Sequence, residues 1–94
     1  MIVGTCLVEL HLAGNDSLKG RRARLKPLIV RLHREFNVSA AEIDHLDSWQ
    51  SAALGLACVA NDPAQAEQIL NNAVHWIEHH RPDLQVVDWQ IEIL

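Results

Sequence analysis

Basic side chains in this 94-residue sequence are concentrated in one short segment. Seven of the eight lysines and arginines lie between residues 19 and 34, and together with Glu35 they give the segment a charge of +6. The rest of the chain, Arg81 against eleven acidic residues, carries −10, so the net charge of −4 hides a dipolar protein. Such a segment is typical of a surface that binds a polyanion, RNA above all. A solvated helix balanced by acids elsewhere is the structural alternative.

A helical period of 100° per residue separates these basic residues into groups. Arg21 falls near the apolar side of the helix. The others lie on the solvent side or flank the solvent side, and they are the residues that we predict to bind nucleic acid: Lys19, Arg22, Arg24, Lys26, Arg31 and Arg34. A helix of this length accommodates about three or four phosphate contacts, so RNA or the ribosome is the expected partner.

The turn Asp44–Gln50 brings acids, a histidine and a serine together. A pair such as His45 and Asp47 could orient a general base, which makes an enzymatic site here the third hypothesis. However, Asp44 and His45 point to opposite faces of a strand, and an edge hairpin seldom buries a nucleophile. We therefore assign no catalytic residue and favour a non-enzymatic binding module. Trp49 is expected to anchor the hairpin against the body of the protein.

Histidines and cysteines provide no complete metal site. His75 and His79 are spaced i, i+4 with His80 adjacent, but no third ligand is in register with them. Cys6 and Cys58 each lie in an apolar run rather than in a CxxC pair, which favours buried, reduced thiols in a cytoplasmic protein. We predict no metal and no cofactor. No apolar run approaches the roughly 18 residues of a membrane-spanning helix, so no membrane association is expected.

The elements that would position these residues follow from the hydrophobic pattern. The length and the 49% apolar composition indicate a single domain over residues 1–94. Alternation and β-rich runs predict strands over residues 2–12, 38–47, 52–60 and 84–93. Helical periods predict helices over residues 18–36 and 63–80, with Ser17 and Asp62 as N-caps. The order β-α-β-β-α-β indicates an α+β, ferredoxin-like fold, a four-stranded antiparallel sheet with two helices on one face.

The register of the outer strands can also be predicted. In the first strand the set containing Cys6, Val8 and Leu10 is apolar and is expected to face the helices. The last strand is expected to place Val87, Trp89, Ile91 and Ile93 on one face, with Asp88, Gln90 and Glu92 on the other.

The opposite face of the sheet is expected to remain uncovered. Its third strand would expose the small residues Ala53, Gly55, Ala57 and Val59. It has none of the aromatic residues that RRM domains use to stack bases, because tyrosine is absent and Phe36 lies in a helix. A homodimer built on this face is therefore predicted, with an interface made of Val3, Leu7, Ala57 and Val59. The alternative function is a regulatory or small-molecule-binding domain whose ligand site lies at this interface.

Several short motifs, in order along nearly the whole chain, resemble the YlxP-like family of small bacterial proteins, a domain-of-unknown-function family. They are Asp16-Ser17-Leu18-Lys19 with Arg22 and Leu25-Lys26, Phe36-Asn37-Val38-Ser39, Ala41-Glu42-Ile43-Asp44-His45, Asp47-x-Trp49-Gln50, Leu54-Gly55, Ala60-Asn61-Asp62 and Ile91-Glu92-Ile93-Leu94. The resemblance implies a ferredoxin-like fold and a bacterial cytoplasmic protein, often encoded near translation-initiation and ribosome-maturation genes. It implies no catalytic residues. Gly20 stands where relatives tend to carry a charged helix former, which predicts a looser helix start.

Overall fold

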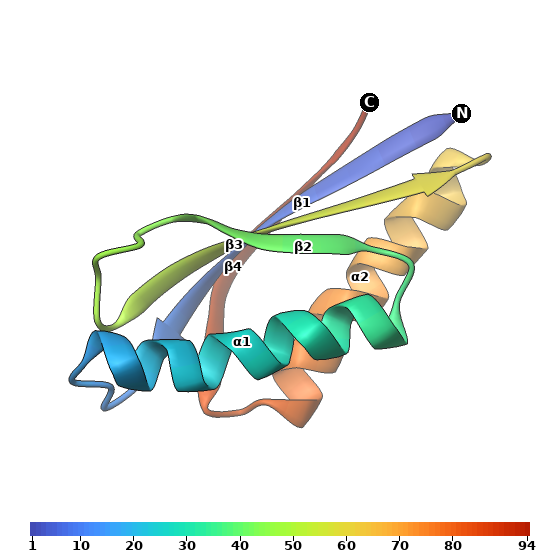
Figure 1. The fold of residues 1–94 in the computed structure, drawn as a ribbon. Helices are drawn as coiled ribbons and strands as arrows, with labels where there is room; N and C mark the ends of the chain where they lie inside the picture. The colour runs from blue at the N-terminus through green and yellow to red at the C-terminus, as the bar shows by residue number, and fades with distance from the viewer.

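The strands and helices follow one another in the predicted order. A computed structural model describes residues 1–94 (Figure 1). Its elements are β1 (Ile2–Leu12), α1 (Leu18–Glu35), β2 (Ser39–Asp44), β3 (Ser51–Ala60), α2 (Pro63–His80) and β4 (Leu84–Ile93). The main difference from the prediction is that β2 ends at Asp44 rather than at Asp47. It ends there because His45 adopts a φ of 59°, in the left-handed region, which turns the backbone out of the strand.

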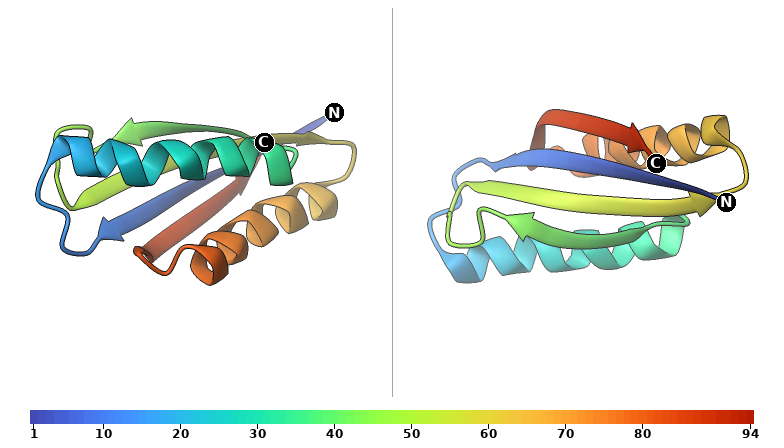
Figure 2. Two further views of the ribbon diagram at one scale, coloured as in Figure 1. Left: turned by 60° about the horizontal axis from the view of Figure 1, so that its bottom comes forward. Right: turned by 90° about the horizontal axis from the view of Figure 1, so that it is seen from above.

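The sheet has the strand order β2-β3-β1-β4, with every neighbouring pair antiparallel. Both helices cover the same face, and the other face carries no helix (Figure 2). This confirms the ferredoxin-like α+β arrangement. The two chain ends meet at one end of the sheet, where the backbone N–H of Leu94 donates to the carbonyl of Val3 at 2.8 Å. Neither helix has the length and apolar composition that a membrane crossing requires.

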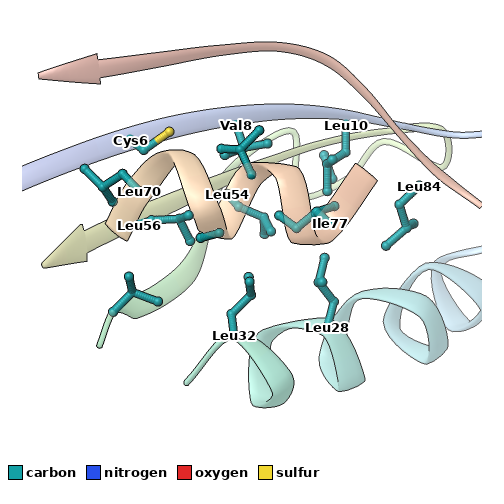
Figure 3. Close-up of a cluster of buried hydrophobic side chains, with 14 of the residues drawn as sticks. Cys6, Val8, Leu10, Leu28, Leu32, Leu54, Leu56, Leu70, Ile77 and Leu84 are labelled. Atoms are coloured by element: carbon teal, nitrogen blue, oxygen red, sulfur yellow. The ribbon is translucent and has the colours of Figure 1, made fainter. Parts of the chain in front are cut away.

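The hydrophobic core lies between the sheet and the two helices. Strand β1 turns alternate residues inward, and its buried set is Cys6, Val8, Leu10 and Leu12, as the alternation predicts. Leucines of α1 and α2 meet these side chains from below, with Leu28, Leu32 and Leu70 among them (Figure 3). Removing such a side chain from water stabilises the fold by about 1.5–3 kcal/mol. Both cysteines are buried and unbridged, as expected.

Side-chain caps begin both helices where the sequence predicts them. The hydroxyl of Ser17 accepts from the backbone N–H of Gly20 at 2.9 Å, and the carboxylate of Asp62 accepts from that of Ala64 at 3.1 Å. Each cap satisfies a backbone donor that the helix leaves free, worth about 1 kcal/mol. Gly20 is also needed for space, because a Cβ there would lie 2.5 Å from Oδ1 of the buried Asn15. The absence of a side chain at Gly20 thus leaves room for the side chain of Asn15, which stabilises the start of the helix.

Strand β4 departs from simple alternation. Its register with β1 shifts by one residue between Glu9 and Leu10, which pair with Asp88 and Val86 and leave Val87 unpaired. The prediction that Val87 shares a face with Trp89 is therefore wrong, and Val87 is 63% exposed in this bulge.

Candidate functional site

Helix α1 carries the basic residues on two different flanks. Lys19, Arg22, Lys26 and Arg34 are all exposed, and none of them takes part in a salt bridge. At 1.5 Å per residue they extend over about 22 Å of the helix. These four side chains form the cationic surface of the protein, called here the α1 cationic surface.

Arg24 and Arg31 lie on the flank that faces α2. Arg31 pairs with Glu35 at 3.2 Å and lies 5.3 Å from the ring centre of Trp76, an ion pair combined with a cation–π contact. Arg24 is half-buried, and its Nη1 is buried without a hydrogen-bond partner. Of the six residues predicted to bind nucleic acid, Arg31 is therefore paired within the protein, and Arg24 is half-buried.

Arg21 is a structural residue. Its side chain is buried, as its place beside the apolar stripe suggests, and it joins α1 to the hairpin between β2 and β3. Nη2 and Nε donate to the carboxylate of Glu42, with Nη2 at 2.6 Å. Nη1 donates to the backbone carbonyls of Ser48 and Ser51. Asn15 adds a further bond, from its Nδ2 to the carbonyl of Trp49. The sequence does not reveal these partners of Arg21, and its one signal for them is the position of an arginine at the edge of an apolar stripe.

The hairpin does not form the His–Asp arrangement that general-base chemistry needs. His45 Nε2 lies 3.3 Å from Oε2 of Glu9, on β1, and not beside Asp47. Ser48 uses its hydroxyl to accept the backbone N–H groups of Gln50 and Ser51, which closes the turn. The histidine and the serine of the hairpin thus have structural partners, and no nucleophile–base contact is present there.

The Glu9–His45 pair also corrects one expectation about the uncovered face. Ala53 of β3 pairs with Glu9 on one side and with Asp44 on the other, so the contact between the side chains of Glu9 and His45 reaches across it. Ala53 is therefore fully buried, although it was expected to be exposed.

The histidines near the end of α2 contact aromatic rings. His80 stacks on Trp76 with ring centres 4.7 Å apart, and His75 meets Trp89 edge-on at 6.2 Å. Nowhere in residues 1–94 do three or more His, Cys, Asp or Glu side chains gather as a metal site would require.

The uncovered sheet face is hollowed along β3. Gly55 and Ala57 have little or no side chain there, and Leu7 and Ile43 rise beside them around a hollow of about 520 Å³. Polar residues also line this hollow, namely Thr5, Ser39, Gln90 and Glu92. A smaller hollow of about 210 Å³ follows at the end of the sheet that carries Val3 and Val59. All four residues predicted for a dimer interface, Val3, Leu7, Ala57 and Val59, thus line one continuous surface.

Comparison with known proteins shows the family. Residues 3–91 match the family model described as "Protein of unknown function (DUF503)". The chain is also 34% identical, over 77 residues, to "Uncharacterized protein YlxP" of Bacillus subtilis (strain 168), an overlap of 82% of this chain and 84% of the relative. Both matches agree with the family that the motifs resemble. The chain belongs to the DUF503, YlxP-like family.

Proposed function

We propose that this protein is a non-enzymatic module that binds RNA, as free RNA or within the ribosome, through the α1 cationic surface. The observation that carries the proposal is a row of four exposed cations on one helix, none of them in a salt bridge, in a protein of net charge −4. Lys19, Arg22, Lys26 and Arg34 have no ionic partner within the protein. The one acid of α1, Glu35, belongs to the other flank, where it pairs with Arg31.

The electrostatic argument concerns counterions. A cation that is already paired within the protein gains little free energy from binding a phosphate. An exposed, unpaired cation that binds RNA releases the counterions condensed on the RNA. The bound state of such a protein is therefore destabilised steeply by salt. This function places the protein in the bacterial cytoplasm, where its RNA partners are found.

Salt titration of RNA binding tests the proposal. With about 0.7 counterions released per contact on a single strand, four contacts lower log affinity by about 3 per decade of salt. The double variant Arg22→Glu with Lys26→Glu is expected to abolish binding. Its stability is expected to stay within about 0.5 kcal/mol of wild type, because both side chains are exposed and unpaired.

The matched control adds acids to the other helix. Gln65→Glu with Gln68→Glu alters exposed positions of α2 and makes the net charge more negative without touching α1. This variant is expected to keep most of the affinity. If the unmodified protein has no affinity for ribosomes or structured RNA at about 50 mM salt, the proposal is wrong.

A second candidate function rests on the hollow of the uncovered face. The apolar surface formed by Val3, Leu7, Ala57 and Val59 has no helix over it, and we propose that a second copy covers it. A ligand site of a regulatory domain could then lie in the enclosed hollow. Leu7→Glu is expected to dissociate the dimer without unfolding the protomer, whereas Val87→Glu, at the β4 bulge, is expected to leave it intact. Light scattering that finds a wild-type monomer at high micromolar concentration would exclude the dimer.

A further inference from the structure

Trp49 is an exposed aromatic residue in the hairpin between β2 and β3. It was expected to anchor the hairpin, but 52% of its surface is exposed. Trp76 differs, because it packs against Phe36, Arg31 and His80. Trp89 is 38% exposed but meets the ring of His75 edge-on. A large apolar ring left half in water at a turn contributes little to the core, so its place requires another explanation.

The backbone of Trp49 is attached to the beginning of α1. Its carbonyl accepts from Asn15 Nδ2, and the carbonyls of Ser48 and Ser51 accept from Arg21. The tip of the hairpin accordingly meets the first turns of α1 (Figure 1). The exposed ring is therefore carried by a backbone that buried side chains hold in place, and a preorganised ring loses little entropy when it binds a partner.

Two of the four cations lie on the flank of α1 that faces the same strand. His33 Nε2 accepts the backbone N–H of Ala40, in β2, at 2.9 Å, so this flank of the helix points toward β2. Arg22 precedes His33 by eleven residues, which is three turns and a rotation of about 20°, and Lys26 lies about 20° from His33 on its other side. Arg22 and Lys26 therefore share a surface with the hairpin that continues β2.

The acids of the hairpin limit what can approach Trp49. Asp44 and Asp47 are exposed near it, and their charges repel a phosphate backbone. A neutral nucleobase meets no such repulsion, and it can stack on an indole ring. Phosphates are thus directed to α1 and a base to the hairpin.

We infer that the protein recognises single-stranded RNA, with phosphates on Lys19, Arg22 and Lys26 and an unpaired base stacked on Trp49. This inference rests on the proposed function and specifies its substrate. A duplex has its bases stacked within the helix, so only an unpaired base can reach the ring. RRM domains place stacking aromatics on their open sheet; here the hairpin beside the helix supplies the ring.

Fluorescence anisotropy with labelled oligoadenylate, and with an RNA duplex of the same length, tests the inference. The wild-type protein is expected to prefer the single strand. Trp49→Ala is expected to weaken binding of the single strand about 5- to 150-fold, the range measured for one stacked base, and to leave the salt slope unchanged. Trp49→Phe is expected to restore most of the affinity. Trp89→Ala, which removes an equal ring from the β4 side, is the matched control and is expected to bind like wild type.

A second measurement does not depend on the stability of Trp49→Ala. In a variant with Trp76→Phe and Trp89→Phe, Trp49 is the only tryptophan left. Its fluorescence is expected to be quenched by oligoadenylate and to be unchanged by an abasic oligomer that binds the same cations. Three results together would exclude stacking and leave the cationic site intact. They are equal binding of strand and duplex by the wild type, unchanged affinity of Trp49→Ala for the single strand, and no quenching. If the wild type binds neither RNA, the proposed function and this inference both fail.

Discussion

Arg21 is expected to be the side chain whose loss unfolds the hairpin and weakens the whole domain. It is 2% exposed and makes four hydrogen bonds, two to Glu42 and one each to the carbonyls of Ser48 and Ser51. Arg21→Ala leaves a carboxylate and two backbone acceptors without this donor. Removal of one partner from a buried ion pair costs about 3–5 kcal/mol. Because the Glu42 side chain is 25% exposed and regains some hydration, we expect the lower end, about 3 kcal/mol.

Thermal and urea unfolding measure this effect. In a domain of this size a loss of 3 kcal/mol lowers the Tm by about 12–24 °C. Lys26→Ala, on the same helix but exposed and unpaired, is the matched control and is expected to change stability by less than about 0.5 kcal/mol. In a double-mutant cycle, Arg21→Ala and Glu42→Ala are expected to show a coupling of about 1–3 kcal/mol. An Arg21→Ala protein within about 1 kcal/mol of wild type would refute the assignment of Arg21 as the clamp.

Three further outcomes are expected. Gly4→Val is expected to destabilise the fold by about 1–3 kcal/mol in urea unfolding, because a Cβ at Gly4 already lies 3.0 Å from Leu70 Cδ1, whereas Gly14→Ala meets no neighbouring atom and tests only backbone strain. The Arg81 guanidinium, hydrogen-bonded to Asp83, lowers the pKa of the Asp83 carboxyl below its ordinary value of 3.8. The ionised carboxylate therefore stabilises the fold above pH 3.8, and this stabilisation is lost as the pH falls. An NMR titration of Arg81→Gln is expected to show the pKa of Asp83 returned to its ordinary value. Burial raises the pKa of Cys6 from 9.0 to about 11, so the folded state favours the thiol and loses stability as the pH rises from 9 toward 11; rapid alkylation of native Cys6 at pH 8 would contradict this.

The order of the elements could be predicted because each signal is local. The alternation in β1, the cap at Ser17 and the Asp62-Pro63 helix start depend on residues within one or two turns of each other. The same periodicity identified which basic residues of α1 face solvent and placed Arg21 beside the apolar stripe. The candidate cationic surface could thus be largely predicted from the sequence. The same holds for the position of Val3, Leu7, Ala57 and Val59 on the uncovered face.

The sequence could not show which of these side chains already have an interaction partner within the protein. Arg31 has Trp76 as a neighbour only because α2 packs beside α1, and Arg21 finds its acceptors in Glu42 and in a turn some thirty residues away. The polar partners of a cation on the buried side or the flank of a helix come from other helices and strands. They are therefore determined by tertiary packing and not by the helical periodicity of the sequence.

The register and exposure of single residues were likewise decided by the tertiary structure. Val87 continues the apolar pattern of its strand, yet a bulge opposite Glu9 and Leu10 leaves it in solvent. Ala53 alternates outward, yet the contact between Glu9 and His45 across it removes it from water. Trp49 was predicted to be an anchor because indole rings are apolar, but the hydrogen bond from Asn15 to its backbone carbonyl fixes it in a turn where the ring is half exposed. A residue type sets how much free energy burial would release, whereas the neighbouring strands and helices determine whether burial takes place.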